Sequence, residues 1–211
     1  MTHLQRSLIV LSILVTCSHS VCGQEPEEGT KRTIEAPSPD GQFAFRYTGE
    51  SDSEKQTYDL IDKASGKVLM IVAESDPDLG ASARFHMDVL WRPDSKAFAL
   101  TATLIKLGSE VTVFMRDGST FRKIRLPALG AEITDKAKKG KSFSHIAELD
   151  SHRAVQWQKD GSLVMEIENI QDGEAASITA TRTVVLAFDR YDKAKVLKST
   201  IKFAVEKPGG E

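Results

Sequence analysis

The sequence predicts an all-β protein made of three similar four-stranded antiparallel meanders, with a short helical or irregular insertion near residues 128–152. Two observations support this prediction. Apolar and polar residues alternate along most of the chain, which is the period of two that strands show. A five-residue segment with aspartate at its fourth position also occurs three times, as "PSPDG" (37–41), "WRPDS" (91–95) and "WQKDG" (157–161).

The repeated segment has the chemistry of a tight hairpin turn. An aspartate can bond its own backbone two residues on, and a proline fixes φ at the first corner. Glycine follows Asp40 and Asp160 and favours a positive φ, whereas Ser95 is a weaker choice at the same place. We therefore expect three hairpins with a shared structural motif, formed by Asp40, Gly41, Trp91, Asp94, Trp157, Asp160 and Gly161.

The first unit is expected to cover residues 33–74. Its segment "QFAFRYT" places Phe43, Phe45 and Tyr47 on one face of a strand, and "DKASGK" supplies its last turn. The expected strands lie near residues 30–36, 42–48, 57–62 and 67–73.

The second and third units follow the same plan over residues 84–127 and 152–206. "EVTVFMR" alternates in the second unit, whose last pair is turned by "RDGS"; "SLVMEIEN" and "TIKFAVE" alternate in the third. The expected strands lie near residues 85–91, 96–104, 110–116 and 120–126, and near residues 153–157, 162–169, 177–189 and 194–205.

The turns "SPDGQFAF" and "LWRPDSKAFAL" resemble the hairpins of TolB-type and WD40-like β-propeller repeats, and each unit has about the length of one blade. The resemblance covers most of residues 37–205. It implies blade-like sheets but no particular activity, because propellers serve as binding platforms, enzymes and scaffolds. Closed propellers typically have four or more blades. Three units leave an open partial propeller, a β-sandwich, and a ring closed by several copies as alternatives.

The N-terminal part of the chain has a recognisable composition. Residues 1–23 have the order of an export signal, with Arg6, an apolar run over residues 8–15 and small residues before Gly23. Cleavage there would remove both cysteines; the alternative is a lipoprotein signal in which "LVTC" carries the lipid on Cys17. Residues 24–32 are expected to be a disordered tether, which leaves 33–206 as one β domain.

The composition narrows the classes of function. With 28 basic and 30 acidic side chains, the chain lacks the strongly basic balance of a nucleic-acid-binding protein, and no later apolar run is long enough for a membrane span. A mature chain without cysteine excludes thiol catalysis and zinc-thiolate sites. No nucleophile elbow or phosphate-binding loop is present, so we expect no cofactor.

One group of residues has the spacing of a metal site. His145, Glu148 and His152 would share a face of a helix and could hold Zn²⁺ with an open fourth position. Gly140 and the serines of this segment disfavour a continuous helix, so a polar surface is the alternative.

Three further patterns each allow a structural and a functional interpretation. His86 and Asp88 alternate on a strand, either as a general base with its orienting carboxylate or as a hydrogen-bonded pair at a sheet edge. The tryptophans before the turns either cover their own hairpins or stack on a partner. A run of lysines either binds an anionic partner or is exposed to solvent on a loop. It consists of Lys136, Lys138, Lys139 and Lys141.

Together these features predict an exported, non-enzymatic binding or interaction module, periplasmic or extracellular, whose loops face another macromolecule. The alternative is a small exported hydrolase or carbohydrate-active enzyme. Such an enzyme would need two carboxyl groups at a set separation. The candidates on loops are Asp76, Asp78, Asp150 and Asp172.

Overall fold

The computed structural model describes residues 31–49, 56–74, 85–104, 108–145, 150–174, 176–189 and 193–206. The predicted export signal therefore lies outside the described residues. The described part consists almost entirely of β-strands, with one helix of four residues. None of its helices has the length and apolar character needed to cross a membrane.

The first meander is a separate four-stranded sheet in which each strand pairs with the next in antiparallel fashion. Its first strand begins at Lys31, so the prediction of a disordered tether up to residue 32 is wrong at its end: Lys31 and Arg32 pair with Gly49 and Thr48. The strands are β1 (Lys31–Glu35), β2 (Phe43–Gly49), β3 (Thr57–Asp62) and β4 (Val68–Glu74).

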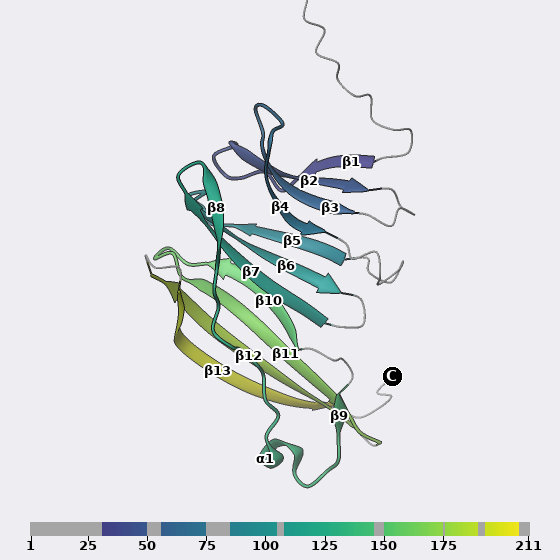
Figure 1. Ribbon diagram of the computed structural model, residues 1–211. Helices are drawn as coiled ribbons and strands as arrows, with labels where there is room; N and C mark the ends of the chain where they lie inside the picture. The colour runs from purple at the N-terminus through teal and green to yellow at the C-terminus, as the bar shows by residue number, and fades with distance from the viewer. Residues whose placement is uncertain are drawn as a thin grey trace, which may run out of the picture.

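The second and third meanders are also antiparallel, but they belong to one larger mixed sheet (Figure 1). They are joined where β10 runs parallel to β7 and Ser151 lies opposite Ser109. The second meander comprises β5 (Phe85–Trp91), β6 (Ala97–Leu104), β7 (Gly108–Asp117) and β8 (Thr120–Ile124); the third comprises β10 (Ser151–Trp157), β11 (Leu163–Asp172), β12 (Ser177–Phe188) and β13 (Ala194–Glu206).

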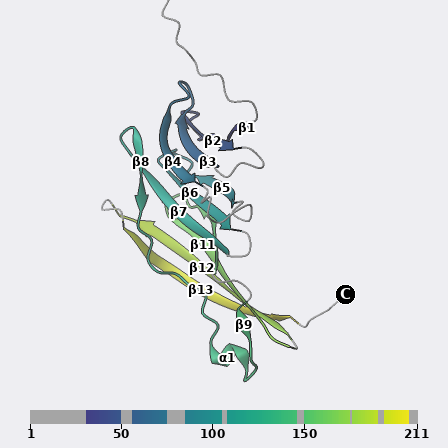
Figure 2. The same ribbon diagram turned by 45° about the vertical axis from the view of Figure 1, so that its right-hand side comes forward.

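The second meander is buried on both faces, and β6 shows why. Phe98 and Leu100 face the first meander and join an aromatic core with Phe43 and Phe45. The intervening residues, such as Ala99, face a larger core shared with the third meander. A strand covered on both sides needs a continuous apolar run, which explains the segment "AFALTATL". Figure 2 shows the first meander turned relative to the rest of the stack.

The three repeated turns have the same geometry and connect paired antiparallel strands, so the hairpin prediction is confirmed. In each, the aspartate carboxylate accepts a backbone hydrogen bond from the residue two positions on. The next residue closes the turn with a positive φ, which is 71° at Gly41, 58° at Ser95 and 83° at Gly161.

The insertion between the second and third meanders packs on the larger core and then forms one short helix and one short strand (Figure 1). Helix α1 (Asp135–Lys138) has Thr134 as its N-cap residue, and the hydroxyl oxygen of Thr134 accepts from the Ala137 N–H. Strand β9 (Ser144–His145) pairs with the end of β11. The prediction of a short helical or irregular insertion is therefore confirmed.

Candidate functional site

The two tryptophans of the turn motif attach each meander to the one before it. Trp91 Nε1 donates to the Ala36 carbonyl at 2.8 Å, and Trp157 Nε1 donates to the Leu90 carbonyl at 2.9 Å. Each acceptor directly precedes the first residue of a turn motif, so the two contacts are equivalent. The Trp91 ring also packs on Phe98 of its own hairpin, with 5.0 Å between the ring centroids, so its bond to the preceding meander adds to the expected cover of the hairpin. The sequence pattern could not show these bonds, because they depend on which carbonyl of the preceding meander faces the indole N–H.

Neighbouring turns also contact each other directly. Ser95 is fully buried, and its hydroxyl accepts a hydrogen bond from the Asp40 N–H at 3.0 Å. Serine at this position therefore supplies an acceptor that glycine could not. Hydrogen bonds from the Ser162 hydroxyl and N–H hold the pKa of Asp160 below its ordinary value. The Ser95–Asp40 bond thus joins two meanders, whereas the Ser162–Asp160 bonds stabilise a single turn.

The candidate metal residues do not lie on one helix. His145 lies in β9 and His152 lies in β10, and both strands pair with β11. Glu148 lies outside the described residues. Among the residues that the structure describes, no group of three potential ligands is close enough to hold a metal ion.

His86 and Asp88 form an exposed pair on β5, an edge strand of the larger sheet. Their side chains are 3.2 Å apart and 76% and 68% exposed. A general base would need a substrate held beside it, and this pair lies on open surface. The geometry matches the hydrogen-bonded pair at a sheet edge.

Of the four loop carboxylates proposed for hydrolysis, the structure describes Asp150 and Asp172. Asp150 uses both oxygens to fix the insertion: one accepts from the Ala131 N–H at 2.9 Å and the other from Asn169 Nδ2 at 2.7 Å. Asp172 is exposed at the far end of β11. Asp76 and Asp78 lie outside the described residues.

A cleft of about 550 Å³ opens where β7 changes partners, between its pairing with β10 and its pairing with β8. Burial lowers the pKa of His152 in its wall, against the opposing effect of the Asp150 and Glu110 charges, so the imidazole is neutral at neutral pH. The neighbouring Ser109 hydroxyl donates to the main-chain oxygen of His152. It is therefore not a nucleophile paired with the imidazole.

Beyond its first residue, Ala194, whose N–H donates to the Arg125 carbonyl, strand β13 pairs only with β12 within the described part of the chain and so presents an unpaired edge. Ile201, Phe203 and Val205 lie on the face that continues the larger core, yet they are 41%, 41% and 51% exposed. On the opposite face of the strand, Lys202 lies opposite Thr181 of β12 and Lys198 lies opposite Val185. We call this region the β13 edge surface. The sequence showed its alternation but could not show that the strand lies at an edge.

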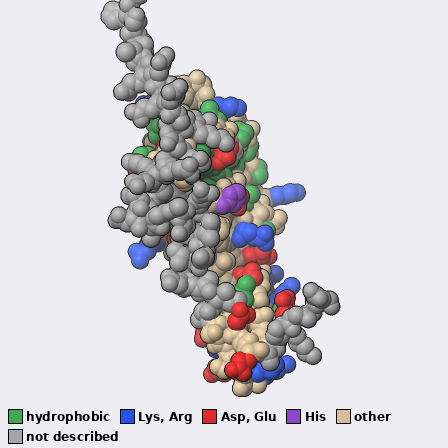
Figure 3. Space-filling model, turned by 90° about the vertical axis from the view of Figure 1, so that its right-hand side faces the viewer, with side chains coloured by type: hydrophobic (Ala, Val, Ile, Leu, Met, Phe, Trp, Pro, Cys, Tyr) green, Lys and Arg blue, Asp and Glu red, His purple; other side chains and the backbone are tan. Residues whose placement is uncertain are grey.

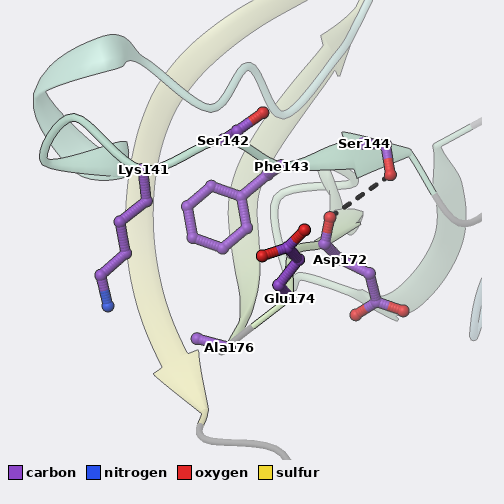
Figure 4. A pocket seen from close by; sticks show the side chains of 8 residues that line it. Lys141, Ser142, Phe143, Ser144, Asp172, Glu174 and Ala176 are labelled. Carbon is purple, nitrogen blue, oxygen red and sulfur yellow. Dashed lines mark hydrogen bonds between the residues drawn. The ribbon is translucent and has the colours of Figure 1, made fainter.

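A second hollow, of about 650 Å³, lies at the far end of the third meander, and we call it the β9 hollow (Figure 4). One wall is the segment before β9 and the other is the turn between β11 and β12. Its lining residues are Lys141, Ser142, Phe143, Ser144, Asp172, Gly173, Glu174 and Ala176. Of the four lysines in the predicted run, Lys141 lines this hollow, and the other three lie in or just after α1. On the face seen in Figure 3, acidic and basic side chains are interspersed over the lower half.

Comparison with protein-family models found no matching family, and comparison with curated proteins found no match.

Proposed function

We propose that this protein is an exported, non-enzymatic binding module that pairs an extended segment of a partner protein with the free edge of β13. The observation that carries the proposal is the β13 edge surface, a strand of 13 residues with three apolar side chains more than 40% exposed. Long, exposed apolar edges are either covered by a partner or prone to aggregate. The leader-like residues 1–23 support export.

The two faces of β13 indicate the chemistry of the partner. An added strand gains main-chain hydrogen bonds, and its side chains alternate between the two faces. One set would pack beside Ile201 and Phe203. The other set would lie beside Lys198 and Lys202, which make no ion pair within the described residues. The partner segment is therefore extended and alternates apolar with acidic residues.

The architecture that presents this edge is an open, propeller-like stack, which we propose on the resemblance of the turns to propeller repeats. Its support is the equivalent placement of Trp91 and Trp157 between successive meanders. The alternative of a hydrolase loses one candidate carboxylate, because both oxygens of Asp150 are engaged by the insertion.

The proposal is tested by titrating the protein with two synthetic octapeptides, one alternating valine with glutamate and one alternating valine with lysine. We expect the glutamate peptide to bind more tightly, and Phe203→Lys to weaken it at least about tenfold by placing charge on the apolar face. Ile71→Lys is the matched control, because Ile71 is an exposed apolar residue on β4, in the first meander. Equal affinities for both peptides, or equal binding by both variants, would exclude the β13 edge surface as the site.

A further inference from the structure

The β9 hollow is built where the insertion approaches the third meander at Gly173. A Cβ added at Gly173 would lie 2.6 Å from the Ser142 carbonyl oxygen and 3.1 Å from Phe143 Cδ1. Only glycine lets the two walls meet at this distance. The Ser144 hydroxyl donates to the Asp172 carbonyl at 3.3 Å and ties the walls together (Figure 4). The volume of about 650 Å³ lies in the range of small-ligand sites.

The groups around the hollow combine an aromatic ring with negative charge. The ring of Phe143 stands in the middle of the hollow, and the carboxylate of Glu174 lies beside it (Figure 4). Asp172 also lines the hollow, but its carboxylate points away from the Phe143 ring (Figure 4). Neither carboxylate makes an ion pair within the described part of the chain. The hollow thus offers a π face and, beside it, the Glu174 carboxylate as an acceptor for a ligand.

We propose that the β9 hollow binds a guanidinium group. A guanidinium is planar, so it can stack on the Phe143 ring while its N–H groups reach a neighbouring carboxylate. Such charge-assisted hydrogen bonds are stronger than neutral ones. The site is independent of the β13 edge surface and needs no acidic partner segment.

The charge of Lys141 distinguishes a cationic ligand of the β9 hollow from an anionic one. Its side chain lines the hollow across the ring from Glu174, and its ammonium group points away from the ring (Figure 4). A cationic ligand is repelled by this charge, whereas an anionic ligand would be attracted by it. Removing the lysine must therefore strengthen the binding of a guanidinium.

The experiment is an NMR titration of the full-length protein with arginine amide at constant ionic strength, with lysine amide as the comparison. We expect saturable shifts with arginine amide and affinity at least about tenfold lower in Glu174→Gln, the loss that one charge-assisted hydrogen bond gives. Lys141→Ala should bind about twofold or more tightly. Glu132→Gln, at an exposed carboxylate of the same insertion outside the hollow, is the matched control and should bind like the wild type.

A pentapeptide with a central arginine between glycines distinguishes the source of the guanidinium. Binding of this peptide as tight as that of arginine amide assigns the site to a protein side chain, and binding of arginine amide alone assigns it to a small molecule. The proposal is overturned if neither probe gives a saturable shift, if Glu174→Gln binds like the Glu132→Gln control, or if Lys141→Ala binds more weakly. Unchanged melting temperatures would show that the exposed variants remain folded.

Discussion

Replacing Trp157 by phenylalanine tests the junction between the second and third meanders. The change keeps a ring in the larger core but removes the hydrogen bond from Nε1 to the Leu90 carbonyl, which is 2.9 Å long. Leu90 is half-buried, and the loss of this hydrogen bond should cost about 1 kcal/mol. For a domain of this size, that loss lowers the Tm by about 2–4 °C. Alanine would also leave a cavity beside Phe188, at a total cost of about 3–5 kcal/mol.

Thermal and urea unfolding of the purified protein would measure these losses. Trp91→Phe is the matched comparison, because Trp91 makes the equivalent bond to Ala36, and its Tm should fall by a similar amount. A Tm of Trp157→Phe within about 1 °C of the wild type would refute the energetic role of the bond. A Trp157→Ala variant as stable as Trp157→Phe would refute the role of the buried ring.

Three further changes test other parts of the structure. Because hydrogen bonds lower the pKa of Asp160, its contribution to stability is present above about pH 4 and lost as the pH falls further; Asp160→Asn should flatten the acid side of the Tm profile, and an unchanged profile would contradict this. Because burial lowers the pKa of His152, the unfolded chain takes up the proton first and stability should fall below about pH 6.5; His152→Gln should remove that slope. Ser95→Gly relieves a positive φ but removes the acceptor of the Asp40 N–H, so urea unfolding should show a loss of about 1 kcal/mol, and a gain would show that backbone strain outweighs the bond.

The strands and the hairpins could be predicted because their signals are local. Alternation placed β5 and β3 at their observed bounds, and the aspartate of each turn determines the turn by a contact with its own backbone. The class of the insertion was also predictable, because residues such as Gly140 and Ser142 interrupt any long helix.

The arrangement of these strands and hairpins depends on contacts between distant residues, which a local sequence pattern does not indicate. The edge contact of Ser109 with Ser151 merges two meanders into one sheet, and it joins residues far apart in sequence. The direction of the Trp157 side chain depends on which sheet lies over it. For the same reason, the exposure of Phe203 and the approach of Phe143 to Gly173 could not be predicted from alternation.

The indole bonds between meanders distinguish the first meander from the other two. Pro37 stands at the position of Trp91 and Trp157 in the first turn motif, and proline has neither an indole nor a backbone N–H to donate. A second molecule placed end to end would meet the third meander with this residue, so the bond cannot be repeated between copies. The sequence thereby removes one route by which repeated units extend into fibres.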